Sequence, residues 1–131
     1  MKRILLVDED DTLAASVAAR LQASGYDVAT ARDAPSGASA AVRQRPDLVI
    51  LDVSTPSGGF SLAERILDIP LAPPVIFMTA RGEPGLERRA LDIGAAAFFE
   101  KPYETEALLA AIRAALGEIG WGRRAETPPL G

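Results

Sequence analysis

The stretch that decides the fold is Asp47-Leu48-Val49-Ile50-Leu51-Asp52, an apolar run that ends in a carboxylate. A near-continuous Val/Ile/Leu run of this length is typical of a strand covered on both faces of a parallel sheet. A second run, residues 3–7, is followed directly by Asp8 and Glu9. If the two strands are neighbours, three carboxylates converge at one edge of the sheet, which favours a divalent cation among them.

The rest of the chain repeats this pattern of apolar runs separated by amphipathic segments. Strands are expected at about 3–7, 27–30, 47–52, 74–79 and 95–99. Apolar residues with helical spacing predict helices at 10–24, 34–45, 60–68, 83–93 and 104–116. Because strands and helices alternate five times, we predict one α/β domain, a three-layer sandwich with helices on both faces of a parallel sheet.

Polar residues follow four of the five predicted strands at the same relative place. Asp8 and Glu9 follow the first, Asp52 ends the third, Thr79 ends the fourth and Lys101 comes just after the fifth. Ligands of open parallel sheets bind beyond the carboxyl ends of the strands, so these five residues form the candidate site. Lys101 is one of only two lysines in a chain rich in arginine. A compact ammonium group suits a point contact with phosphate.

Each of these residues also has a purely structural interpretation. The acids at 8–11 could cap the first helix, a role that Asp10 or Asp11 is expected to fill. Asp52 could be a turn residue, Thr79 a strand-end hydroxyl and Phe98 a core side chain. Taken together, these interpretations do not explain why the polar residues that end apolar strands all fall at one edge of the predicted sheet.

Composition excludes several classes of function. The chain has 131 residues, enough for one domain with its own core, and 48% of them are hydrophobic. A net charge of −4 argues against direct nucleic-acid binding, and the absence of cysteine and histidine excludes thiolate, zinc–thiolate and histidine chemistry. The remaining ligand chemistry is based on oxygen and points to magnesium or calcium. No signal peptide or membrane span is visible, so a cytoplasmic location is expected.

Four motifs, in this order and at these intervals, resemble the receiver domain of bacterial two-component response regulators. The resemblance covers residues 2–117, and it implies a flavodoxin-like (βα)5 fold with strand order 2-1-3-4-5. The motifs are Ile4-Leu5-Leu6-Val7-Asp8-Glu9; Pro46-Asp47-Leu48-Val49-Ile50-Leu51-Asp52 with Pro56 four residues on; Val75-Ile76-Phe77-Met78-Thr79-Ala80; and Gly94-Ala95 followed by Phe98-Phe99-Glu100-Lys101-Pro102.

The resemblance implies that Asp52 is a phosphoacceptor supplied by a sensor histidine kinase or a histidine phosphotransfer protein. Catalysis of such a transfer is mostly positioning and charge stabilisation. Lys101 and Thr79 are the implied contacts of the phosphoryl oxygens. Thr79 and the aromatic Phe98 are the implied switch, which would change the face formed by helix 4, strand 5 and helix 5 and alter binding of a downstream effector.

Mg²⁺ is the implied cofactor. Its implied ligands are Glu9, Asp52 and the backbone carbonyl of Ser54, with Asp8 acting through water. The acidic pair is Asp-Glu, whereas Asp-Asp is commoner in the family. The loop after Asp52 is one residue short, because its glycines come six and seven residues after the aspartate where relatives have one at eight.

Domain boundaries and surface composition complete the prediction. Residues 1–118 are assigned to the receiver domain, and residues 119–131, rich in glycine and proline, to a flexible tail or linker stub. Relatives that dimerise for DNA binding often carry two acids before the switch aromatic. Ala96 and Ala97 stand there in this chain, so the charged dimer face of that subgroup is incomplete.

Two alternatives remain open at this point. A haloacid-dehalogenase-like phosphatase also uses a strand-end aspartate and magnesium, but it requires a second acid where this chain has Ser54. A degenerate receiver that is never phosphorylated and acts as a constitutive interaction module would retain the fold. A nucleotide-binding Rossmann domain is excluded, because no Gly-x-Gly-x-x-Gly motif or P-loop follows the first strand.

Overall fold

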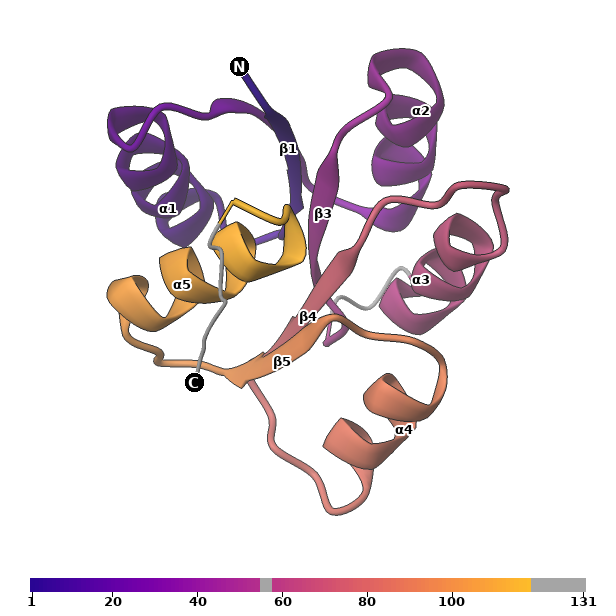
Figure 1. Ribbon diagram of the computed structural model, residues 1–131. Helices are drawn as coiled ribbons and strands as arrows, with labels where there is room; N and C mark the ends of the chain where they lie inside the picture. The colour runs from indigo at the N-terminus through magenta and orange to yellow at the C-terminus, as the bar shows by residue number, and fades with distance from the viewer. Residues whose placement is uncertain (55–57, 119–131) are drawn as a thin grey trace, which may run out of the picture.

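The computed structural model describes residues 1–54 and 58–118 (Figure 1). The proposed tail at 119–131, and Pro56 in the shortened loop, lie outside the described residues. Five parallel strands form one sheet in the order β2-β1-β3-β4-β5, which confirms the predicted fold and strand order. The strands are β1 (Arg3–Val7), β2 (Asp27–Ala31), β3 (Leu48–Asp52), β4 (Val75–Thr79) and β5 (Ala97–Glu100).

Helices cover both faces of this sheet, as Figure 1 shows, with α1 and α5 on one face and α2, α3 and α4 on the other. Alternate residues of each strand point to opposite faces, so Ile4 and Leu6 pack against one helix layer and Leu5 and Val7 against the other. The helices are α1 (Asp11–Ala23), α2 (Ala34–Gln44), α3 (Gly59–Leu67), α4 (Leu86–Asp92) and α5 (Thr105–Ala115).

The central strands are apolar along their whole length because both of their faces are buried. All five residues of β3 and of β4 are buried, including Asp52 and Thr79 at their carboxyl ends. The first helix begins where Asp10 accepts a hydrogen bond from the backbone N–H of Leu13 at 3.0 Å, which confirms the expected cap.

The fourth helix is shorter than the predicted 83–93. Pro84 and Gly85 occupy a turn closed by a hydrogen bond from Leu86 N–H to the Glu83 carbonyl, so α4 begins only at Leu86. Gly85 has φ 83° and ψ −8°, which a glycine adopts readily at the third position of a type II turn. The proline and glycine of this turn are therefore what shortens the helix.

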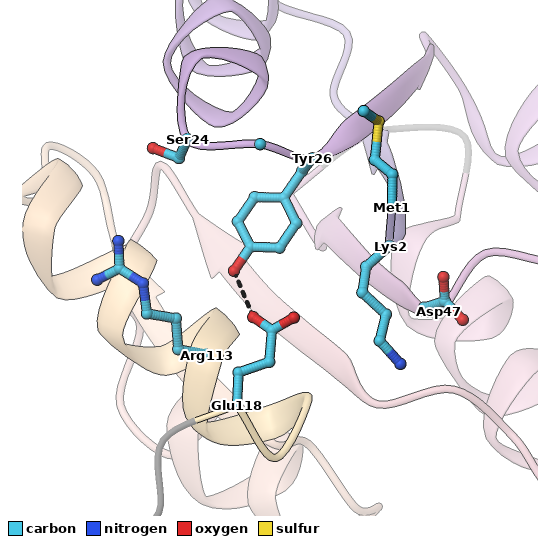
Figure 2. A pocket seen from close by; sticks show the side chains of 8 residues that line it. Met1, Lys2, Ser24, Tyr26, Asp47, Arg113 and Glu118 are labelled. Carbon is cyan, nitrogen blue, oxygen red and sulfur yellow. Dashed lines mark hydrogen bonds between the residues drawn. The ribbon is translucent and has the colours of Figure 1, made fainter.

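At the amino ends of the strands, the end of α5 is fastened to the start of β2. Figure 2 shows the Tyr26 hydroxyl donating a hydrogen bond of 2.8 Å to the Glu118 carboxylate, beside a hollow of about 760 Å³. Arg113 of α5 and Lys2 also line this hollow. Burial, followed by the hydrogen bond and the negative charge of Glu118, raises the pKa of Tyr26 to about 12. The phenol therefore remains a donor at neutral pH.

Candidate functional site

Neighbouring strands bring the two aspartates of the candidate site together. In the β1–β3 pair, Val7 lies opposite Leu51, so Asp8 and Asp52 are the next residues of adjacent strands. Both are almost fully buried, with exposed fractions of 2% and 4%. Lys101 directly follows β5 at the same edge, and its peptide bond to Pro102 is cis. The topology therefore places two carboxylates and one ammonium group at one edge of the sheet.

Lys101 bridges the two carboxylates. Its Nζ lies 2.8 Å from Oδ2 of Asp8 and 2.8 Å from Oδ2 of Asp52, and 13% of the lysine side chain is exposed. Burial alone would lower the pKa of Lys101, but its hydrogen bonds and charge pairing with Asp52 and Asp8 outweigh it, so the pKa is raised. The lysine is consequently charged over the whole physiological range.

The remaining oxygen of each carboxylate is held by the residues that follow it. Asp8 Oδ1 accepts a hydrogen bond from Asp10 N–H at 2.9 Å, and Asp52 Oδ1 accepts one from Ser54 N–H at 2.8 Å. The Ser54 hydroxyl donates a second, short hydrogen bond to the same Asp52 oxygen. Each aspartate thus forms an Asx turn with its own backbone, which directs its Oδ2 toward Lys101.

Thr79 lies at the same edge of the sheet, but its hydroxyl forms its hydrogen bonds with the loop that follows β4. It donates to the Arg81 carbonyl at 3.1 Å and accepts from Arg81 N–H at 3.0 Å. A hollow of about 300 Å³ beside Ser54 is lined by both Thr79 and Arg81. Thr79 is therefore next to Asp52 without being bonded to it. Phe98 lies on β5 opposite Phe77 and is partly buried against the core of the α2–α3–α4 face.

The donor chemistry at this edge suits a hard cation. Mg²⁺ is bound in proteins through one or two carboxylates together with water and substrate oxygens. Asp8 and Asp52 provide two carboxylates, while Glu9 is exposed beside them. Within residues 1–54 and 58–118, no three acidic side chains come close enough to form a metal cage. The residues fit a magnesium ion that keeps much of its water.

One aromatic neighbour of the site was not predicted from the sequence. Tyr103 packs against Phe99 with ring centroids 5.8 Å apart, and its hydroxyl contacts Met78 Sδ at 3.8 Å. Burial raises the pKa of Tyr103, and the charge of Lys101 acts in the opposite direction. Its position two residues after Lys101 is the one sequence signal that could have placed Tyr103 beside the site.

A comparison with known families identifies the family of this chain. The sequence model described as response regulator receiver domain matches residues 4–113. The chain belongs to the response regulator receiver family. Membership supports a phosphoacceptor role in two-component signalling, and such receiver domains are signalling switches rather than classical enzymes. It gives no support to the dehalogenase-like phosphatase.

Relatives of this receiver domain include regulators and isolated receiver domains. It is 36% identical over 123 residues to the DNA-binding dual master transcriptional regulator RpaA of Synechocystis sp., covering 88% of this chain and 49% of that protein. It is 31% identical over 124 residues to the phosphate regulon transcriptional regulatory protein PhoB of Pseudomonas aeruginosa, covering 92% and 54%. This receiver domain spans about half the length of these two relatives.

Solved structures agree with the fold. A CheY-like receiver domain from Methanospirillum hungatei superposes with a TM-score of 0.84 at 28% identity, covering 90% of this chain and 95% of that one. The non-phosphorylated HemR receiver domain from Leptospira biflexa gives a TM-score of 0.81 at 29% identity, covering 95% of this chain and 99% of that one.

Among the residues that the structure describes, none of the helices of this receiver domain has the length and apolar character needed to span a bilayer.

Proposed function

We propose that this receiver domain accepts a phosphoryl group on Asp52 from a sensor histidine kinase or a histidine phosphotransfer protein in the cytoplasm. The observation that carries the proposal is the bridge from Lys101 to two buried strand-end carboxylates. A structural ion pair would need only one carboxylate. Two carboxylates around one ammonium group leave an excess negative charge, which suits a site that binds a further cation.

In the proposed reaction, one carboxylate oxygen of Asp52 attacks the phosphorus of a phosphohistidine. An O–P bond forms as the P–N bond breaks, and the imidazole leaves with the electron pair of that bond. The product is an acyl phosphate on Asp52. Ser54, which bonds Oδ1, fixes the orientation of the carboxylate for the attack. Lys101 already lies 2.8 Å from Oδ2, and its ammonium group offsets charge on the phosphoryl oxygens.

Asp8, Glu9, Asp52 and the backbone carbonyl of Ser54 are the groups that would hold Mg²⁺. When bound, the ion supplies the positive charge that Lys101 alone does not provide for the phosphoryl group. Asp8 is held by Asp10 N–H and by Lys101, so its orientation is set before any ligand arrives. Glu9 is exposed and has the side-chain length to turn toward the site.

The proposed switch uses Thr79, Phe98 and the α4–β5–α5 face. The Thr79 hydroxyl is held by two hydrogen bonds to one loop residue, so its reorientation toward a phosphoryl group breaks only local contacts. Among the residues of α4, Ala90 alone is buried, and no side chain caps the start of this helix. This weak anchoring supports movement of α4 and a changed surface for a downstream effector protein or domain. Direct nucleic-acid binding is not part of the proposal, given the net charge of −4.

The test is intact mass after incubation with acetyl phosphate and Mg²⁺, with Asp52→Asn as the matched control. The proposal expects a gain of one phosphoryl group that EDTA prevents and Asp52→Asn lacks. No gain under conditions that label another receiver domain would favour the constitutive interaction module instead. A gain that persists in Asp52→Asn would place the acceptor elsewhere.

A further inference from the structure

A groove runs between the C-terminal parts of α2 and α3, which lie side by side on the same face of the sheet (Figure 1). Two hollows of about 560 and 220 Å³ form it. Pro46 and Pro73, just before β3 and β4, line one end, so the groove lies toward the amino ends of these strands and away from Asp52. The two hollows are continuous because they share Ala41, Val42, Ile66 and Ile69.

Exposed apolar side chains gather at this α2–α3 groove. Of the five large hydrophobic side chains that are exposed in the described parts of the chain, three line it. Val42 is 73% exposed, Ile69 is 45% exposed and Leu71 is fully exposed. Leu71 also has a φ of 59°, a left-handed backbone conformation that a leucine rarely adopts. A scattered exposed apolar residue is ordinary, but a cluster with a strained leucine indicates a binding surface.

The groove is also positively charged. Arg45 and Arg65 are the charged residues that line it. Within the described ranges, neither guanidinium group has an ion pair or a side-chain hydrogen bond, whereas Arg3 and Arg32 pair with acids at 3.1 and 2.8 Å. Arginine near the end of α2 and of α3 complements the helix dipoles. The dipoles do not account for the apolar cluster between the two arginines.

We propose that the α2–α3 groove binds a short amphipathic helix of a partner protein that carries acidic residues beside its apolar face. Leucine-type side chains three and four residues apart would contact Val42, Ile69 and Leu71. Carboxylates flanking them would pair with Arg45 and Arg65, for which the described parts of the chain provide no ion pair. Because the groove lies away from Asp52, its binding does not depend on the proposed phosphorylation.

The probe is a fluorescein-labelled synthetic helix of about 14 residues, with leucines on one face and glutamates beside them. Fluorescence anisotropy is expected to show saturable binding, with NMR shift changes confined to the groove. Val42→Ser and Ile69→Ser each weaken binding by about tenfold, since apolar anchors dominate small interfaces. Both positions are exposed, so the variants keep their melting temperature. Leu91→Ser on α4 is the matched control and leaves binding unchanged.

Charge is tested separately. Arg45→Gln with Arg65→Gln weakens binding and flattens its salt dependence, while Arg43→Gln, outside the groove, does neither. The double variant Arg45→Glu/Arg65→Glu binds a probe with lysine in place of glutamate. No saturation up to about 1 mM, or equal loss in Leu91→Ser, overturns the proposal. Self-association that disappears in Val42→Ser also overturns it, because the groove would then bind a second copy of this chain.

Discussion

Replacing Lys101 by methionine removes the only positive charge that contacts the two buried carboxylates in the described parts of the chain, and keeps most of the side-chain volume. Asp8 and Asp52 have side-chain exposures of 2% and 5%, so water cannot replace the lost ammonium group fully. Removing one partner of a buried ion pair costs about 3–5 kcal/mol. The 13% exposure of Lys101 lets some water in, which places the expected loss near the lower limit, at about 3 kcal/mol.

A second substitution identifies the cause of that loss. In Lys101→Met, the remaining defect is two like charges that share a buried site. Adding Asp52→Asn removes one of them, so the double variant is expected to regain about half of the lost stability. A loss caused by poorer packing of the methionine would be unaffected by the second change.

The pH dependence follows from the raised pKa of Lys101. The contacts of Lys101 with the carboxylates contribute fully to the free energy of unfolding below 10.5, the pKa of lysine in the unfolded chain. This contribution is lost as the pH rises through the higher pKa of the folded state. The difference between wild type and Lys101→Met is therefore constant from neutral pH to about pH 9 and shrinks above 10.5. Urea unfolding in the presence of EDTA measures this difference in unfolding free energy. A difference below about 0.5 kcal/mol at neutral pH would refute the reasoning.

Two further predictions concern residues outside the charged cluster. Tyr26→Phe loses the hydrogen bond to Glu118 and about 1 kcal/mol of unfolding free energy. Because the folded pKa of Tyr26 is about 12, above its ordinary 10.0, wild type loses stability from pH 10 to 12, and urea unfolding of the variant should lack this contribution. Gly59→Ala places a Cβ 2.7 Å from Val53 Cα, where the backbone cannot move aside, and should lower the free energy of unfolding by about 1–3 kcal/mol in the same urea measurement. A Gly59→Ala protein as stable as wild type would contradict that close approach.

Most of the fold could be predicted because the sequence and the packing agree at each level. Runs such as Leu48–Asp52 are apolar throughout, and the structure buries every residue of that strand. The predicted ends of the helices and strands were less accurate. The predicted helix at 83–93 included turn residues, because the apolar spacing from Leu86 to Ile93 indicates a helix but does not mark where it begins.

The site was predictable in position but not in orientation. Strand ends place Asp8, Asp52 and Lys101 together, and the structure joins them by two contacts of 2.8 Å. No sequence pattern indicates that Thr79 bonds its own loop, since a hydroxyl can rotate toward any nearby partner. The reason for the glycine in the loop after Asp52 is likewise visible only in the structure. A Cβ at Gly59 would lie 2.8 Å from the Asp52 carbonyl oxygen and 2.7 Å from Val53 Cα, so no side chain fits there.

The scarcity of lysine has a practical consequence for handling this molecule. Lys2 and Lys101 are the only lysines in the sequence, and Lys101 is largely buried with both carboxylates bonded to it. Lys2 is exposed at the amino end of β1, about 20 Å of extended chain away from Asp8. Among side chains, amine-coupling reagents should therefore attach at Lys2. A sensor chip coated through it would hold the molecules in one orientation, with the aspartates facing the solution.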